Sequence, residues 1–137
     1  MTKEFIPYEQ ALALKELGFD EPCLASWTYK TKERIPTLYG CGALLFDTDG
    51  LITNQTEDII CSAPTFHQAF RWFREKHNLI ISIERNRKYK NIKRYEVLID
   101  ESTDDKFGIV LFRTDYYDTY EEAELECLNT LIKIVKS

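Results

Sequence analysis

Three β-type runs follow one another in the second half of the chain, and the short connections between them strongly constrain the fold. The runs are Leu79–Arg85, Arg94–Asp100 and Phe107–Arg113. In the second run apolar and polar residues alternate, with Leu98 as the single apolar residue on the other face, which is typical of a half-buried strand. A parallel crossover needs a dozen or more residues, and the connecting segments are shorter. The sequence therefore predicts an antiparallel meander from residue 79 onwards.

Helical periodicity occurs in three further segments, Tyr8–Leu17, Thr65–Asn78 and Thr119–Lys136. Pro7 suits an early position of the first helix, because its fixed φ matches the helical value. The first helix is expected to end at Gly18, which can adopt the left-handed conformation of a C-terminal cap.

The second and third helices begin with similar polar signatures. Thr65 with Gln68, and Thr119 with Glu122, have the spacing of a capping box, in which each partner satisfies a backbone N–H of the other. The three helix starts lie 58 and 54 residues apart. Either an internal duplication or the recurrence of capping chemistry explains the similarity, and the sequence leaves both open.

Two more β-type runs precede the central helix, at Leu24–Tyr29 and Leu38–Phe46, with Leu51-Ile52 beyond a turn. Together with the meander they predict an α+β fold, in which three helices pack on an antiparallel sheet of about five to six strands.

A chain of 137 residues is expected to form a single globular domain over residues 1–137, because it can bury about two thirds of its unfolded surface. The first residues contain no apolar leader and no run has the length of a membrane span, so we expect no membrane partner and a location in the cytosol of the host cell.

The four cysteines form no Cys-x-x-Cys pair, which favours buried free thiols over zinc or redox chemistry.

The net charge of -5 is unevenly distributed. Residues 62–99 carry nine basic and three acidic side chains, whereas residues 1–61 and 100–137 carry net charges of -5 and -6. The run 85–94 holds most of the excess and is expected at the tip of a hairpin. Its cations either bind an anionic partner or blunt a sheet edge against aggregation. The negative net charge of the whole chain argues against binding of a DNA duplex, and sequence-specific nucleic-acid binding is not expected.

The central helix contains both histidines of the chain, two arginines and four large aromatic residues. A helical wheel places Phe66, Phe70, Phe73, Ala69 and His77 on one buried stripe, with Trp72 apart from it. His67, Arg71 and Arg74 form a narrow cationic edge, which becomes a candidate site only if the basic hairpin lies beside it. Two histidines ten residues apart do not face one another, so no metal site and no catalytic triad is expected.

The run Phe46-Asp47-Thr48-Asp49-Gly50 resembles the nucleophile loop of haloacid-dehalogenase-type phosphatases, which use an aspartate pair and Mg²⁺. Asp104-Asp105 could supply the later acidic pair of that family. That fold, however, has a doubly wound parallel sheet, which conflicts with the antiparallel meander. The run is better explained as a hairpin turn closed by Gly50. A Mg²⁺-dependent phosphatase is kept as a remote alternative function.

The last helix is apolar over more than half of its circumference, so it must bury two sides, either in the core or against a second copy. Homodimerisation through this helix is therefore a hypothesis. The pair Tyr116-Tyr117 just before the helix is typical of recognition surfaces and also of a strand-to-helix joint.

Three blocks of the chain form a distinctive pattern, PYEQALALKELGFDEPC at 7–23, APTFHQAFRWFREKHNL at 63–79 and YDTYEEAELECLNTLIKIVK at 117–136. In this order they resemble a family of small uncharacterised proteins of phages and prophages of gut bacteria. Segment 24–62 and the basic hairpin correspond poorly. The resemblance implies a small cytosolic accessory protein of a mobile element that binds a host protein or a nucleotide immune signal, and it transfers no catalytic residue.

The sequence thus favours a non-enzymatic binding protein without cofactor, possessing a site for an anionic small molecule such as a nucleotide. The alternative is an inhibitor or adaptor that binds a host protein with its tyrosines and basic hairpin. The candidate ligand-binding residues are His67, Arg71, Arg74, Arg85, Arg87, Lys88, Tyr89, Lys90, Lys93, Arg94, Tyr116 and Tyr117.

Overall fold

The structure is a computed structural model that describes residues 4–27, 37–38, 60–85, 94–102, 109–113 and 117–137. Backbone contacts divide the chain into two compact units, Met1–Gln68 and Ala69–Ser137.

Within its described residues, the first unit contains one complete helix and a small antiparallel sheet. Helix α1 spans Tyr8–Glu16, and the strands are β1 (Ala25–Trp27), β2 (Thr37–Leu38) and β3 (Cys61–Ser62). The strand order is β2-β1-β3, and both pairs are antiparallel.

Helix α1 ends in a complete Schellman motif. Gly18 has φ of 96°, its N–H donates to the Lys15 carbonyl at 3.0 Å, and the N–H of Phe19 donates to the Leu14 carbonyl at 3.0 Å. Both Leu14 and Phe19 are buried, so the chain folds back over the last turn as the position of Gly18 in the sequence predicts.

Two polar side chains link separate segments of the first unit. The indole N–H of Trp27 donates to the Ile6 carbonyl at 3.2 Å. The amide of Gln68 donates to the Pro22 carbonyl at 2.7 Å and accepts from the thiol of Cys23, whose sulfur lies 3.6 Å away. The expected cap is present, because the Gln68 N–H donates to Thr65 Oγ1 at 3.2 Å. The Gln68 side chain, however, is used for the Pro22–Cys23 segment.

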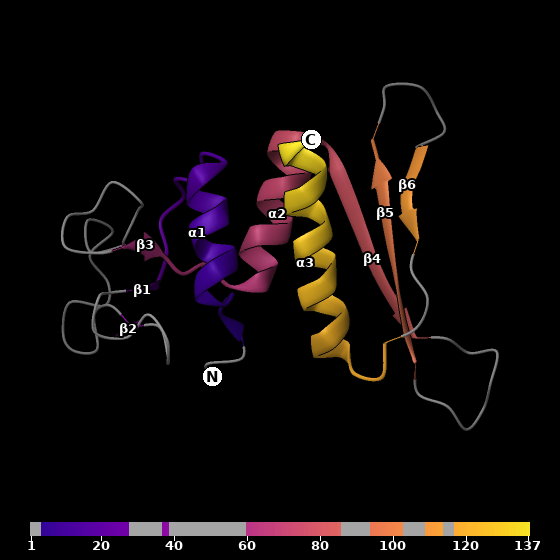
Figure 1. Cartoon of the computed structure of the whole chain (residues 1–137), viewed down its shortest axis with the longest axis horizontal. Helices are drawn as coiled ribbons and strands as arrows, with labels where there is room; N and C mark the ends of the chain where they lie inside the picture. Colours follow the sequence, from indigo (N-terminus) through magenta and orange to yellow (C-terminus); the bar gives the residue numbers. More distant parts are fainter. Residues whose placement is uncertain (1–3, 28–36, 39–59, 86–93, 103–108, 114–116) are drawn as a thin grey trace. The chain divides into compact units, whose positions relative to one another are not determined.

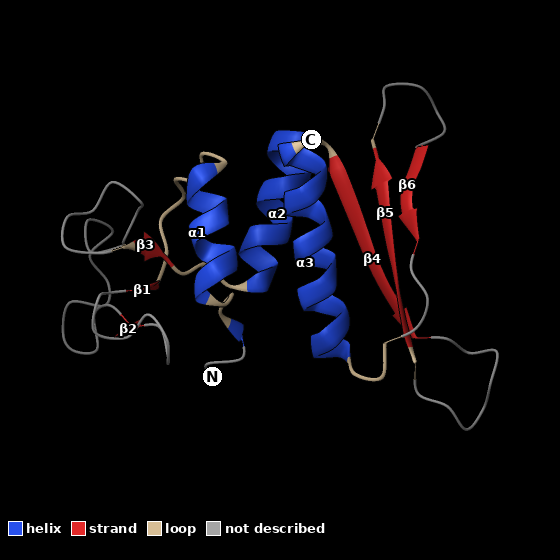
Figure 2. Ribbon diagram, viewed as in Figure 1, coloured by secondary structure: helices blue, strands red, loops and turns tan. Residues whose placement is uncertain are grey.

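The second unit combines two helices with an antiparallel sheet (Figure 2). Helix α2 spans Phe66–His77, with its first residues in the first unit, and α3 spans Tyr120–Lys136. The strands, in the order β4-β5-β6, are β4 (Leu79–Arg85), β5 (Tyr95–Glu101) and β6 (Ile109–Arg113). Strands β4 and β5 pair without interruption from Leu79↔Glu101 to Arg85↔Tyr95.

Helix α3 lies along one side of this sheet and contacts β5 and β4 (Figure 1). Val97 and Ile99 of β5, and Leu128 and Leu131 of α3, are completely buried. The N–H of Glu122 donates to Thr119 Oγ1 at 3.1 Å, which confirms the expected cap at the start of α3. Much of the apolar stripe that suggested a homodimer is therefore buried in the structure, and dimerisation through α3 stays a prediction.

The joint between α2 and β4 is a left-handed residue, Asn78, with φ of 55°. Its carbonyl accepts from the N–H of Ser102 at 2.8 Å, which ties the joint to the end of β5. The His77 ring packs on Trp72, with ring centroids 4.9 Å apart, and on Phe73 at 5.9 Å. The wheel set Trp72 apart from the buried stripe, but its side chain is only 4% exposed, and its ring meets the Phe73 ring edge to face.

The predicted α+β fold, with three helices and antiparallel strands, is confirmed. The helix boundaries agree within one residue, and β4 has the expected bounds. The described strands form two sheets rather than one, and the short strand β3 was not expected. The expected strand at Leu51-Ile52 and most of the run Leu38–Phe46 lie outside the described residues.

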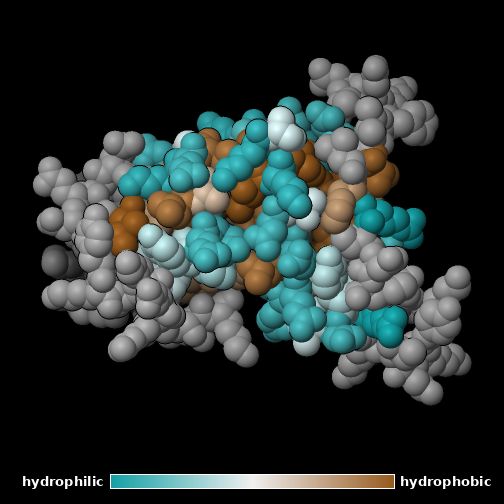
Figure 3. All heavy atoms as spheres, viewed as in Figure 1, coloured by the Kyte–Doolittle hydropathy of each residue, from teal (hydrophilic) through white to brown (hydrophobic). Residues whose placement is uncertain are grey.

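On the face seen in Figure 3, the described elements present both polar and apolar side chains. Among the described residues, no helix combines the length and the apolar character that crossing a bilayer requires.

We expect Gly18→Ala to lower the free energy of unfolding by about 1 kcal/mol, the cost of holding an L-residue in the left-handed region. A Cβ at this position would meet nothing within 4 Å, so the loss would come from the backbone rather than from a clash. Gly18→Asn is the matched control and should lose less, because asparagine tolerates this conformation. Urea titration measures both variants, and equal stability of Gly18→Ala and wild type would contradict the Schellman motif.

Candidate ligand-binding site

The two described residues of the basic run 85–94, Arg85 and Arg94, lie at one end of the β4–β5 ladder. Arg85 is the last residue of β4 and lies directly opposite Tyr95, the first residue of β5. Arg94 precedes Tyr95 in the chain, and both arginines are exposed. Because the strands are antiparallel, the two arginines flank the connection between them and lie at the same end of the sheet.

Tyr117 lies on the other side of Tyr95 from Arg85. It forms an isolated antiparallel bridge with Tyr95, and each backbone N–H donates to the other residue's carbonyl at 2.8 Å. Directly opposite residues project from the same face of a sheet. Arg85, Tyr95 and Tyr117 therefore form a row across the sheet, on the same face as the buried Val97 and Ile99.

A third tyrosine, Tyr120, joins this row to helix α3. The ring of Tyr120, in the first turn of α3, meets the Tyr95 ring edge to face, with centroids 5.6 Å apart and planes at 84°. Tyr120 remains 41% exposed. Partial burial, followed by the charge of Glu124, raises the pKa of its hydroxyl, so it stays a neutral hydrogen-bonding group. We call Arg85, Arg94, Tyr95, Tyr117 and Tyr120 the tyrosine–arginine end.

The charges around the tyrosine–arginine end are asymmetric. Cations lie on the strand side, whereas Glu121 and Glu122 occupy the first turn of α3. Such a site can hold a small anion with an aromatic part, by guanidinium contacts and ring packing. The carboxylates on the helix side would repel a long polyanion.

The remaining predicted site residues divide into two groups. His67, Arg71 and Arg74 are exposed residues of α2. His67 belongs to the first unit, and α2 leads into the beginning of β4 rather than to its end. The structure therefore does not assign these three to the tyrosine–arginine end. The other candidates lie outside the described residues, and they are Arg87, Lys88, Tyr89, Lys90, Lys93 and Tyr116.

Two members of the tyrosine–arginine end were missed by sequence reasoning. Tyr95 was considered only as a strand residue, and Tyr120 only as part of the apolar stripe of α3. The position of Tyr95 directly after the basic run was an available signal. The contact with Tyr120 depends on the way α3 packs on the sheet, which local sequence does not reveal.

The described thiols are unsuited to nucleophilic or redox chemistry. Cys23, Cys61 and Cys127 are free and buried, as expected. Burial raises the pKa of Cys23 to about 12 and that of Cys127 to about 12. Burial also raises the pKa of Cys61 to about 11, although the Lys15 cation opposes the rise. Because the thiolate is the reactive form, these groups are inert near neutral pH.

Neither a metal centre nor the phosphatase alternative gains support from the described part of the chain. No group of three or more His, Cys, Asp and Glu side chains within it is placed to hold a metal ion. The described strand pairs are all antiparallel, unlike the parallel sheet that the phosphatase fold requires. The Asp47–Asp49 loop and Asp104-Asp105 lie outside the described residues.

Comparison of the chain with protein-family models, curated proteins and solved structures finds nothing that matches. The resemblance to small phage proteins therefore stays a prediction, and the function must be argued from the residues themselves.

We expect the three described thiols to react with Ellman's reagent about 100- to 1000-fold more slowly in the folded protein than in guanidinium chloride, since each pKa unit lowers the thiolate fraction tenfold. The measurement uses a Cys41→Ser variant, which removes the cysteine outside the described residues. Equal rates in the folded and unfolded states would contradict the burial of these thiols.

Proposed function

We propose that this chain is a non-enzymatic binding protein that holds an anionic ligand of the nucleotide class at the tyrosine–arginine end. The row Arg85–Tyr95–Tyr117, fixed by backbone pairing across the sheet, carries the proposal. It places a cation beside aromatic rings on elements whose backbone geometry is held by hydrogen bonds.

The two kinds of side chain match the two parts of a nucleotide. A guanidinium donates paired hydrogen bonds to phosphate oxygens, and Arg85 and Arg94 are both exposed for this contact. A tyrosine ring offers a face on which a base can stack, a contact worth about 1–3 kcal/mol per base in other systems. The segment between the two arginines adds four more basic residues in the sequence.

The charge asymmetry limits the size of the ligand. The acidic first turn of α3 adjoins Tyr120, and the whole chain has a net charge of -5. A nucleic-acid backbone would meet this negative charge, whereas a mononucleotide or a cyclic dinucleotide is small enough to remain beside the arginines.

A binding role rather than catalysis is supported by the state of the reactive groups. The described thiols have raised pKa values, and the ring of His77 is packed against Trp72 and Phe73. Neither the thiols nor His77 belongs to the tyrosine–arginine end.

The resemblance to phage proteins supplies the proposed setting, in which the ligand is a nucleotide immune signal that the protein sequesters in the host cytosol. The alternative function, an inhibitor or adaptor of a host protein, would use the same tyrosines and arginines against an acidic protein surface. The two differ in whether a free nucleotide binds at all.

We expect isothermal calorimetry against a panel of linear and cyclic nucleotides to detect saturable binding of one class at low salt. Replacing both Arg85 and Arg94 by alanine should weaken binding at least about tenfold, because each charge-assisted hydrogen bond contributes about 1.5–3 kcal/mol. Tyr117→Ala should weaken it as well, whereas Tyr117→Phe should retain the stacking part.

Lys133→Ala, which removes an exposed cation from the last turn of α3, is the matched control and should bind as wild type. Arg74→Ala asks separately whether α2 contributes. The proposal fails if no nucleotide binds, or if binding survives the loss of both arginines.

A further inference from the structure

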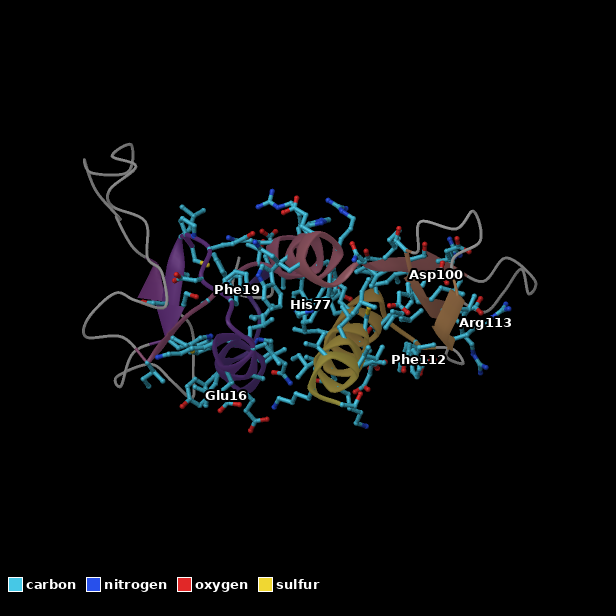
Figure 4. The ribbon with its side chains drawn as sticks, turned by 90° about the horizontal axis from the view of Figure 1, so that it is seen from above. Glu16, Phe19, His77, Asp100, Phe112 and Arg113 are labelled. Carbon is cyan, nitrogen blue, oxygen red and sulfur yellow. The ribbon has the colours of Figure 1, made fainter. Side chains whose placement is uncertain are left out.

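The face of the β4-β5-β6 sheet that points away from α3 carries a second surface of different chemistry. Val97 and Ile99 point toward α3, so strand alternation places Glu96, Leu98 and Asp100 on the opposite face. Residues directly across the ladders complete this surface, which we call the outer face; they are Ile80, Ser82 and Glu84 of β4 and Val110 and Arg113 of β6. In Figure 4, Phe112 lies on the α3 side of the sheet and Arg113 on the other.

A β-bulge in β6 shapes the outer face. The register shifts between Ile99 and Asp100, because Ile99 pairs with Phe112 while Asp100 pairs with Val110. The pairing skips Leu111, and a regular ladder would have given Val110 and Phe112 the same face. The bulge therefore turns Val110 outward, where it is 56% exposed.

Asp100 lies on the central strand β5, near one end of this face, between two open apolar side chains. It is directly opposite Ile80, which is 42% exposed, on one side and Val110 on the other. Oxygen Oδ1 of Asp100 is buried and has no hydrogen-bond partner among the described residues. A buried carboxylate oxygen without a donor is destabilising, and native proteins contain few such groups.

The charge of the outer face selects the kind of partner. Glu84, Glu96 and Asp100 are acidic, and Arg113, which forms an ion pair with Glu96, is the basic residue. Glu84 and Asp100 leave the face negative. Two copies packed through it would bring like charges together in a chain that is already at -5, which disfavours self-association. A cationic partner with apolar neighbours complements both properties.

We propose that the outer face binds a protein segment that presents a Lys or Arg side chain between apolar side chains. The cation lies beside the Asp100 carboxylate, and the apolar neighbours cover Ile80 and Val110. This surface is separate in charge and in residues from the tyrosine–arginine end, so it goes beyond the proposed nucleotide binding.

The test uses the full chain and a fluorescein-labelled peptide of alternating valine and lysine, about seven residues long to match an ordinary strand. We expect fluorescence anisotropy to show saturable binding. Asp100→Asn should weaken it at least about tenfold, as expected for loss of a charge-assisted hydrogen bond. Ile80→Ser combined with Val110→Ser should weaken it similarly.

The matched controls carry equivalent changes elsewhere. Leu24→Ser alters an apolar side chain that is 54% exposed in the first unit, and Glu126→Gln removes an exposed carboxylate from α3. Both should bind the peptide as wild type does. Asp100→Asn should also unfold in urea no more easily than wild type, because oxygen Oδ1 has no hydrogen bond among the described residues that the change would remove.

Four outcomes would overturn the proposal. They are no binding of the valine–lysine peptide, equal binding of a valine–glutamate peptide, equal loss in the controls, and a dimer in sedimentation that the Ile80→Ser, Val110→Ser pair dissociates. The last would assign the face to a second copy. Nucleotide binding is measured on the same variants and should not change, so the two proposals can fail independently.

Discussion

Helix α3 packs on the central strand β5, and this contact decides which side of each strand in the second unit is buried. Val97 and Ile99 lie at the centre of the contact and are completely removed from solvent. Because β5 pairs with β4 on one side and β6 on the other, its alternation is imposed on both neighbours through the register. A shift of one residue in β5 would exchange the buried and exposed sets of the whole sheet.

The same constraint produces two surfaces of opposite charge from one sheet. Tyr95 is two residues before Val97, so strand alternation places it on the same face, where its ring meets Tyr120 on the helix side. Arg85 and Tyr117 lie directly opposite Tyr95 on the two neighbouring segments. Strand alternation places Asp100 on the opposite face, the outer face, with Ile80 and Val110. A basic, aromatic end and an acidic, apolar face suit an anionic small ligand and a cationic protein segment, respectively.

Local signals in the sequence were sufficient for the helices and for the first strand of the meander. Thr65 and Thr119 cap their helices as predicted, and Gly18 ends α1, because capping depends on residues only a few positions apart. The continuous β4–β5 ladder also follows from pattern and loop length.

Features that depend on long-range pairing were not predictable from the sequence. The bridge between Tyr95 and Tyr117 joins residues of separate segments, and the bulge that turns Val110 outward leaves no local mark that single-sequence patterns reveal. The division of the strands into two sheets is likewise a tertiary property. The sequence makes the exposed arginines of α2 part of the cationic site only if the basic hairpin lies beside them, and the direction of α2 and β4 does not assign them to the end where Arg85 lies.

The central claim is that a nucleotide-class anion binds where the sheet places Arg85 beside Tyr95 and Tyr117. The most direct measurement is a titration of ¹⁵N-labelled protein with the nucleotide that binds most tightly in calorimetry, followed by amide chemical shifts. The account predicts that the largest shifts among the described residues occur at Arg85, Arg94, Tyr95 and Tyr117, with little change along the outer face at Ile80 and Asp100. Shifts centred on Arg71 and Arg74 of α2, or within the first unit, would contradict it.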